Sequence, residues 1–342
     1  MNPRRLSEAA ALAAVVLAGV LILAHNVRGM ADVTLLNVSY DPTRELYERL
    51  NPSFESADAR AEGHTIHIRQ SHGGSSRQAR AVIAGEEEAD VVTLGLPSDV
   101  DGLAKRGLVG QDWAAQFPNR AVPYTSTIVF VVRAGNPKAV HDWPDLVREG
   151  VEVVTPDPKS SGNGKLSVLA AWGSVVTRGG DAAAAHDYLQ ALYAHAVGLN
   201  PGARGAADTF AVERVGDVHL TWENEAIREV AASNGALQIV YPPVSILAEP
   251  SVAVVETNAH RHGLTTEAKA YLAYLFTESA QETIADLGYR PTNLKVRDRH
   301  TDRLPPLTLF PVTAIARDWA DAQQRFFAEN GVLDTLHRPK TQ

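Results

Sequence analysis

Four short turns in the sequence combine small polar residues with glycine at the start of a predicted helix. The turns are Ser39-Tyr40-Asp41-Pro42, His72-Gly73-Gly74-Ser75-Ser76, Ser160-Ser161-Gly162-Asn163-Gly164 and Gly202-Ala203-Arg204-Gly205-Ala206. The first N–H groups of a helix have no partner inside it and carry about half a positive charge, and glycine and serine let a ligand approach them closely. Facing one another, such turns would bind an anion through main-chain N–H groups. Taken singly, each turn is more typical of a plain helix cap.

The elements that must position these turns alternate between strand and helix, which is typical of an α/β fold. Apolar or alternating runs predict strands at Val33–Ser39, His64–Gln70, Asp90–Gly95, Thr127–Arg133, Val151–Thr155, Val218–Trp222, Leu237–Tyr241 and Ser251–Val255. Caps and apolar periodicity predict helices at Thr43–Phe54, Ser76–Gly85, Ser98–Gly107, 165–177, Asp181–Ala196, Asn224–Ser233, Thr265–Phe276, Ser279–Leu287 and Pro311–Glu329. Asp41 is expected to be an N-cap, with Pro42 as the first helical residue. The turn at Gly202 has no clear strand before it.

These elements suggest two α/β lobes that close like a clamshell on a ligand. We expect the chain to cross between the lobes near Tyr124–Val131 and Leu247–Val254. Lobe one would then be discontinuous, over residues 32–126 and 250–312, and lobe two would span residues 127–249. Residues 313–342 would form a C-terminal helix and tail.

The composition limits the classes of protein to which the chain can belong. The chain has 342 residues, of which 45% are hydrophobic and 21% charged, enough for two domains with proper cores. Its net charge of −8 argues against a nucleic-acid-binding protein, which needs a basic surface. The chain has no cysteine, so disulfides, thiolate metal sites and a cysteine nucleophile are excluded.

The N-terminal segment, residues 1–31, has the layout of a cleaved secretory signal peptide. Arg4 and Arg5 precede an apolar run of 16 residues at positions 9–24, and Gly29-Met30-Ala31 supplies small residues for cleavage. A membrane anchor needs about 20 apolar residues, so retention as an anchor is the less favoured alternative. Removing the segment takes away three basic residues and one acidic residue and changes the net charge from −8 to −10. An exported, acidic, cysteine-free chain points to a bacterial periplasm.

Two other groups of residues invite a catalytic or metal-binding interpretation. His64 and His67 would point to opposite faces of their predicted strand, so a metal shared with His72 is not expected. Glu223 and Glu225 stand at a helix start, where carboxylates are typically solvated or cap the helix. The sequence therefore predicts no metal site and no paired acid–base site.

Seven segments of the chain closely resemble the periplasmic sulfate-binding proteins of sulfate/thiosulfate ABC importers. They are LNVSYDPTRELY (36–47), RQSHGGSSRQ (69–78), ADVVTL (89–94), YTSTIVFVVR (124–133), GARG (202–205), TWENEA (221–226) and ILAEP (246–250). The resemblance runs from about Val33 to Leu336. It implies a two-lobed type II periplasmic-binding fold with the ligand between the lobes, and a monomer that works without a cofactor. It also implies sulfate or thiosulfate as the ligand, and the permease and ATPase subunits of an ABC importer as partners.

The resemblance also implies which residues hold the anion. In that family the donors are mostly backbone N–H groups, with one serine hydroxyl and one tryptophan indole. Carried over motif by motif, the contacts are Asp41, Ser75, Ser161, Gly162, Asn163, Ala203 and Trp222. Arg204 would support the site from behind without touching the anion. This chain has SGNG where the family often has a second glycine after the serine, so the turn conformation at Asn163 is the weakest point of the comparison.

A cage made of donors alone suits sulfate, which at neutral pH is a dianion with acceptors only. Burying it requires a hydrogen bond to every oxygen, and hydrogen bonds to a charged group are the strong ones. Hydrogen phosphate carries an O–H that would find no acceptor, at a cost of ~1–3 kcal/mol. The sequence therefore predicts a preference for sulfate over phosphate, with the N–H of Asp41 rather than its carboxylate facing the ligand.

An exported hydrolase of sulfate or phosphate esters is the competing function, because the same cage would stabilise its oxyanions. It would need a nucleophile and metal-binding carboxylates. The chain has no cysteine to convert and no Asp/His cluster around Ser75 or Ser161, although His72 lies three residues before Ser75. The run Lys159–Ser167 lacks the first glycine of a phosphate-binding P-loop and has leucine after Lys165, so that interpretation is rejected.

Overall fold

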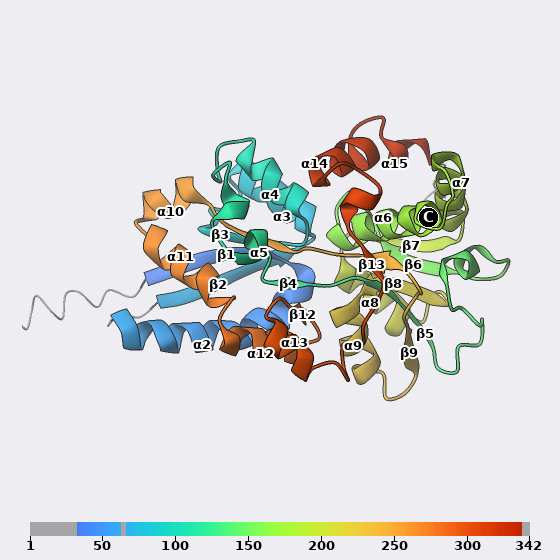
Figure 1. The fold of residues 1–342 in the computed structure, drawn as a ribbon, viewed down its shortest axis with the longest axis horizontal. Coiled ribbons are helices and arrows are strands. Elements are labelled where there is room, and N and C mark those ends of the chain that lie inside the picture. Colours follow the sequence, from blue (N-terminus) through green and yellow to red (C-terminus); the bar gives the residue numbers. More distant parts are fainter. Residues whose placement is uncertain (1–32, 63–65, 337–342) are drawn as a thin grey trace, which may run out of the picture.

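The computed structural model describes residues 33–62 and 66–336, and it shows two α/β lobes side by side (Figure 1). The predicted signal peptide and His64 lie outside the described residues. The first lobe is built on a four-stranded sheet in the order β11-β3-β1-β2. Its strands are β1 (Val33–Tyr40), β2 (Ile66–Gly73), β3 (Val91–Leu94) and β11 (Ser251–Val254), of which only β11 is antiparallel to its neighbour.

The second lobe is built on a five-stranded sheet in the order β7-β6-β8-β5-β9. Its strands are β5 (Ile128–Arg133), β6 (Val153–Pro156), β7 (Ala196–Asn200), β8 (Val218–Trp222) and β9 (Leu237–Val240). Strand β5 runs antiparallel to β8 and β9, whereas β6 runs parallel to β7 and β8. Four shorter strands are β4 (Tyr124–Thr125), β10 (Ser245–Ile246), β12 (Arg290–Pro291) and β13 (Leu309–Phe310).

Helices cover the sheets of both lobes. The longer helices of the first lobe are α2 (Arg44–Glu62), α3 (Ser75–Ala84), α4 (Pro97–Ala104), α10 (Glu256–His262), α11 (Thr265–Tyr274), α12 (Glu278–Asp286) and α13 (Leu294–Arg299). Those of the second lobe are α6 (Gly162–Val176), α7 (Ala182–Ala194), α8 (Ala203–Ala211) and α9 (Glu223–Ala232). Single turns occur at η1 (Asp41–Thr43), η2 (Trp113–Ala115), α5 (Pro118–Ala121) and η3 (Trp143–Val147). None of the helices in the described ranges combines the length and apolar character that a membrane span requires.

Each lobe has its own apolar core because side chains alternate along its strands. On β5, Ile128, Phe130 and Val132 pack on one face with α6 and α7, while Val129 and Val131 pack on the other with α8 and α9. All four residues of β3 are buried because helices cover both faces of the first sheet. The positions of the helix starts therefore follow from packing on two rigid sheets.

The chain crosses between the lobes in two neighbouring segments, and a third time between α13 of the first lobe and β13, whose Phe310 packs in the core of the second. Ser126 and Ala248 form an antiparallel bridge, with N···O distances of 3.1 and 2.9 Å in the two directions. This bridge lies within the two stretches that the sequence suggested as crossing strands. The lobe boundaries and a hinge at this bridge remain a prediction.

The C-terminal segment differs from the single helix predicted over Pro311–Glu329, and that prediction is wrong. The structure has a 3₁₀ turn η4 (Val312–Ala314), a short helix α14 (Trp319–Ala322), a π-helical turn η5 (Gln323–Phe327) and α15 (Val332–Thr335). The helix is interrupted because Asp318 caps a new one, accepting from the N–H of Asp321 at 2.7 Å. Apolar periodicity alone does not reveal such an interruption.

Two further differences concern the turns at helix starts. Helix α6 begins at Gly162, three residues before its predicted start, because Ser161 is its N-cap. Strand β7 precedes the turn at Gly202, where no strand was clear from the sequence. It is an edge strand, mostly only half-buried, so it lacks the strong apolar pattern of a central strand.

Candidate functional site

The helix starts of both lobes converge on one small cavity, with about 160 Å³ of empty space including its opening to solvent. Its lining is Tyr40, Asp41, Pro42, Gly73, Gly74, Ser75, Ser161, Gly162, Asn163, Ala203 and Trp222. This set includes all seven contact residues expected from the sequence, and residues of both lobes contribute. The part of this space that the centre of a water-sized guest can occupy is about 10 Å³, far below the volume of a drug-sized pocket (about 300–1,000 Å³), so the cavity suits a small guest.

Glycines allow the two lobes to meet closely around the cavity. A Cβ on Gly74 would lie 2.5 Å from the carbonyl oxygen of Ser160 in the other lobe. A Cβ on Gly202 would lie 2.6 Å from a carboxylate oxygen of Asp41. Both distances are shorter than atoms tolerate. At Gly74 the close atom belongs to the backbone, so this position needs glycine for the lobes to approach this closely, whereas at Gly202 the Asp41 side chain would have to move.

Asp41 presents the start of the first helix to the cavity, but not as an N-cap. Tyr40 is the capping residue, and Asp41 is the first residue of η1, so the N-cap prediction is wrong. The reason is that β1 continues to Tyr40, which is in register with Gly73 of β2, and the helical turn begins directly afterwards. The Asp41 carboxylate accepts from the Arg44 guanidinium at 2.9 Å. The N–H of Asp41 therefore has no acceptor within its own helix.

Ser75 lines the cavity at the start of α3, yet its hydroxyl is already engaged. Its Oγ donates to Asp99 Oδ2 at 2.6 Å and accepts from the N–H of Gly95 at 2.9 Å. Ser76 donates to the other Asp99 oxygen at 2.8 Å. A hydroxyl has one proton to donate, so the free donor of Ser75 is its main-chain N–H.

Ser161 has the reverse arrangement of Ser75: its main-chain N–H is engaged and its hydroxyl proton is free. Its main-chain N–H donates to the carbonyl of Asp157 at 2.9 Å, and its Oγ accepts from the N–H of Gly164. The hydroxyl proton therefore stays available to a guest. The next two residues, Gly162 and Asn163, begin α6, where the first N–H groups have no acceptor in the helix.

Asn163, the departure from the glycine common in the resembling family, fits the helix. It lies inside α6 and is not among the described residues with positive φ. Its side-chain amide donates to the carbonyl of Leu220 at 3.0 Å, two residues before Trp222. The main-chain N–H is retained, so the substitution does not remove a donor from the cavity.

Trp222 brings a buried indole to the cavity. It is 0% exposed and its ring lies 5.4 Å from that of Tyr40. The indole N–H groups of Trp113, Trp143 and Trp319 each donate to a protein oxygen. Among the described residues, the Trp222 indole forms no such hydrogen bond, and Trp222 lines the cavity. A cavity-lining donor without a protein partner points to a ligand acceptor.

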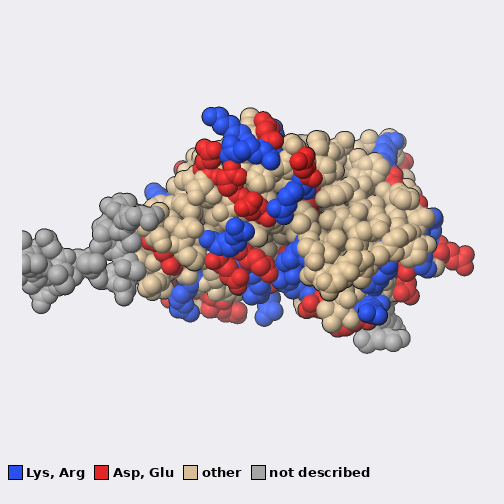
Figure 2. All heavy atoms as spheres, turned by 90° about the horizontal axis from the view of Figure 1, so that it is seen from below, with Lys and Arg blue, Asp and Glu red and all other residues tan. Residues whose placement is uncertain are grey.

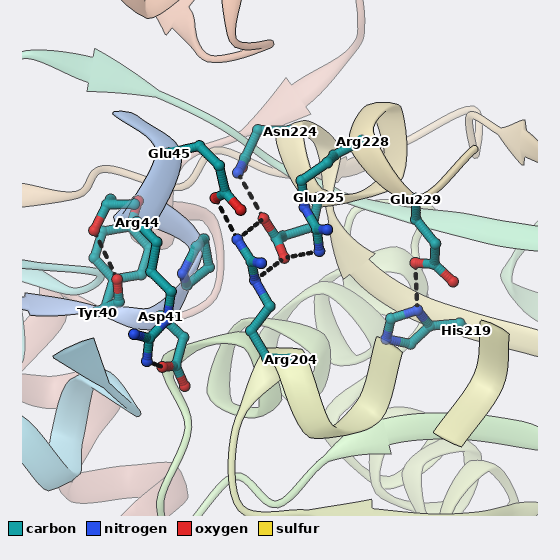
Figure 3. Close-up of polar contacts among 12 residues, drawn as sticks. Tyr40, Asp41, Arg44, Glu45, Arg204, His219, Asn224, Glu225, Arg228 and Glu229 are labelled. Carbon is teal, nitrogen blue, oxygen red and sulfur yellow. Dashed lines mark hydrogen bonds and ion pairs between the residues drawn. The ribbon is translucent and has the colours of Figure 1, made fainter. Parts of the chain in front are cut away.

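Arg204 does not line the cavity but connects the lobes beside it (Figure 3). It forms ion pairs with Glu45 of α2 and, at 2.9 Å, with Glu225 of α9. Arg228 also contacts Glu225, at 3.1 Å. Partial burial of Glu45 favours a higher pKa, but the lowering effects, of which the hydrogen bond from Arg204 is the largest, together outweigh it, and the pKa of Glu45 is lowered. The pair therefore stays ionised and ties the start of α2 to the start of α8.

The interpretation of Glu223 and Glu225 as solvated or capping carboxylates is wrong. Glu225 is 1% exposed and Glu223 is 0% exposed. Glu223 is held by Arg290 through two bonds of 2.6 and 2.7 Å. Burial raises the pKa of both carboxyls, although their arginine partners act to lower it. Because Arg290 is 67 residues away along the chain, local sequence could not reveal this pair.

Three alternative interpretations, a metal site, a Ser75 nucleophile activated by His72 and a nucleic-acid surface, find no geometric support in the described residues. Residues 33–62 and 66–336 contain no cluster of three or more His, Asp or Glu side chains placed to hold a metal ion. The Ser75 hydroxyl is bonded to Asp99 rather than to His72. On the face drawn in Figure 2, basic and acidic side chains are interspersed and form no continuous basic stripe of the kind that nucleic acid requires.

His72 lies just before the glycines of the cavity and gives the protein a predicted acid sensitivity. Burial, with the nearby Arg44 guanidinium, lowers the pKa of His72 to about 4. The unfolded chain would bind a proton near pH 6.5 and the folded one only near pH 4, so stability falls as pH drops through that window. We expect His72→Gln to reduce this loss by about 1–2 kcal/mol, after allowance for partial exposure.

Urea unfolding at pH 7 and pH 4.5 measures this loss. His67→Gln, on an exposed position of the same strand, is the matched control. An equal loss of unfolding free energy in wild type and His72→Gln would contradict the assignment.

Comparisons with known proteins agree with this geometry. Residues 35–290 match the family described as "Bacterial extracellular solute-binding protein". The sequence is 46% identical over 311 residues to the sulfate-binding protein of Escherichia coli, covering 90% of this chain and 94% of that protein. It is 44% identical over 309 residues to the thiosulfate-binding protein of Pseudomonas aeruginosa, covering 89% and 92%.

A solved structure gives the same picture. The sulfate-binding protein SubI from Mycobacterium tuberculosis superposes with a TM-score of 0.79 at 32% identity, covering 86% of this chain and 100% of that one. The two-lobed α/β fold expected from the sequence is thereby confirmed. The chain belongs to the bacterial extracellular solute-binding protein family, and its relatives at 44–46% identity are sulfate- and thiosulfate-binding proteins.

Proposed function

We propose that this protein captures sulfate, with thiosulfate as an alternative ligand, in the cavity between its lobes. It would do so in the periplasm, after cleavage of the segment 1–31, and deliver the anion to the permease and ATPase of an ABC importer. The observation that carries the proposal is the convergence of four helix starts, and of one indole without a protein acceptor, on a single small cavity. The names of the similar proteins support the same ligands.

The proposed donors number seven. Five are main-chain N–H groups, one is the Ser161 hydroxyl and one is the Trp222 indole; the N–H groups belong to Asp41, Ser75, Gly162, Asn163 and Ala203. Each sulfate oxygen could then accept one or two hydrogen bonds. None of the described residues that line the cavity is Lys or Arg, so the charge would be balanced by the positive ends of the helices rather than by a counter-cation.

The proposed closed state is reinforced by pairs that join the lobes outside the cavity. Glu45 belongs to the first lobe and Arg204 to the second, so their ion pair forms only when the lobes approach. Since the Glu45 side chain is 38% exposed, the pair contributes modestly, about 0.5–1 kcal/mol. Holding the lobes together should slow the escape of the anion.

We expect Glu45→Gln to weaken sulfate binding about threefold, with most of the change in the dissociation rate. The effect should shrink above about 0.5 M salt, because exposed pairs are screened. Glu48→Gln, an exposed carboxylate one turn along α2, is the matched control. Stopped-flow release kinetics that are identical for Glu45→Gln and wild type would show that the pair does not favour the closed state.

Titration calorimetry with sulfate and thiosulfate tests the proposed function directly. One anion should bind per chain, and purified protein should not turn over aryl sulfate or aryl phosphate esters. Turnover that disappears in Ser161→Ala would instead favour the hydrolase. Absence of heat with both anions would overturn the binding proposal.

A further inference from the structure

The C-terminal segment contributes to a buried ammonium group that lies between the two lobes. Lys165 of α6 is 5% exposed, and its Nζ donates to Gln323 Oε1 at 2.8 Å. The same Nζ lies 3.5 Å from Asp99 of α4 in the first lobe and 5.4 Å from the ring centre of Phe327. Gln323 and Phe327 are the first and last residues of the π-helical turn η5, so this turn supplies two of the three contacts of the ammonium.

The π-helical turn is anchored on the second lobe. Its backbone is closed by a bond of 3.0 Å from the N–H of Ala328 to the carbonyl of Gln323. Phe326 is 0% exposed and meets Trp172 of α6 edge-on at 5.1 Å. In Figure 1 this segment lies over α6. Gln323 therefore moves with Lys165 and the second lobe, while Asp99 belongs to the first.

Asp99 connects the ammonium to the cavity. Its two oxygens accept from the hydroxyls of Ser75 and Ser76, at 2.6 and 2.8 Å. These serines begin α3, and Ser75 lines the cavity. The polar contacts thus run continuously from the C-terminal segment, through Lys165 and Asp99, to a helix start that faces the proposed anion.

We propose that Gln323 is a positioning residue for anion binding, which presents the Lys165 ammonium to Asp99 across the closing lobes; this inference rests on the proposed function. A lysine side chain is flexible and loses rotamer freedom when it is fixed. Gln323 and Phe327 fix it within the second lobe, before the lobes meet. An ammonium also needs acceptors when it is buried, and Gln323 supplies one whether or not Asp99 is near.

Gln323→Met tests the inference, because it keeps the side-chain length and removes the acceptor. We expect sulfate binding to weaken threefold to tenfold, mainly through faster dissociation. The control is Gln324→Met, the exposed next residue of the same turn. Should Gln323→Met fail to fold, Gln323→Glu serves instead, since its carboxylate would compete with Asp99 for the ammonium and weaken binding as well.

A double-mutant cycle with Lys165→Met separates positioning from a merely structural role. Since Gln323 acts through Lys165, adding Gln323→Met to Lys165→Met should change sulfate affinity by less than twofold. Additive losses, or unchanged affinity in Gln323→Met while wild type binds sulfate, would overturn the inference alone. Absence of sulfate and thiosulfate binding by wild type would overturn the proposed function, and the inference with it.

Discussion

Trp222→Phe is expected to lower sulfate affinity by about tenfold to a hundredfold. Phenylalanine keeps the buried ring against Tyr40 but removes the indole N–H, a cavity-lining donor that forms no hydrogen bond with the described residues. A hydrogen bond to a charged group contributes about 1.5–3 kcal/mol, and about 1.4 kcal/mol corresponds to a factor of ten in affinity. Titration calorimetry measures the change.

Trp319→Phe is the matched control for this experiment. Its indole donates to Glu249 at 3.1 Å and it does not line the cavity. Sulfate affinity should stay within twofold of wild type in that variant. If Trp222→Phe also bound sulfate as tightly as wild type, the indole would not contact the anion and the donor set would need revision.

Gly74→Ala is expected to weaken sulfate binding by more than a hundredfold while leaving the fold intact. The added Cβ would lie 2.5 Å from the Ser160 carbonyl oxygen of the opposite lobe, so the lobes could not close fully. The backbone of Gly74 is extended, with φ −60° and ψ 130°, a conformation that alanine adopts without strain. The substitution therefore opposes closure rather than folding. Calorimetry gives the affinity, and small-angle scattering with saturating sulfate gives the degree of closure.

Gly102→Ala in the same lobe controls for the loss of a glycine. The nearest atom to its added Cβ is 3.8 Å away, which is an ordinary contact. Both variants should unfold at temperatures close to that of ligand-free wild type. If Gly74→Ala became as compact as wild type when sulfate is added, the close approach at Ser160 would not be needed for binding.

Much of the fold could be predicted from the sequence because central strands and capped helices have strong local signals. Strand β8 was predicted with its observed bounds, Val218–Trp222, since all five of its residues are buried. The edge strand β7 was missed because most of its residues are half-exposed and leave no clear apolar pattern. The C-terminal helix was predicted too long because Asp318 caps a new helix within it and the following π-helical turn packs on α6 through Phe326 and Trp172, which apolar periodicity does not reveal.

The proposed site could be predicted from motifs because helix starts are local features. Gly–Ser turns mark where free N–H groups occur, and the sheet topology then brings several of them to one cavity. Whether each serine offers its main-chain N–H or its hydroxyl to the cavity could not be predicted. Asp99, which engages the Ser75 hydroxyl, and Asp157, which accepts from Ser161, are recognised as partners only in three dimensions.

The supporting ion pairs were not predictable for the same reason. Arg204 is 159 residues from Glu45, and Arg290 is 67 residues from Glu223. Glutamates at a helix start are usually solvated, so local sequence favoured the wrong interpretation of Glu223 and Glu225. Glu223 pairs with Arg290 of the first lobe and Glu225 with Arg204 and Arg228 of its own lobe, and only the folded chain shows these contacts.

Competition between sulfate and hydrogen phosphate tests the central claim most directly. The cavity offers donors from main-chain N–H groups, one hydroxyl and one indole, so the proton of hydrogen phosphate would lack an acceptor. Calorimetric titration of sulfate at pH 8, where phosphate is mainly the monoprotonated dianion, should give the same affinity with and without 1 mM phosphate. Displacement of sulfate by an equal concentration of phosphate would contradict the account.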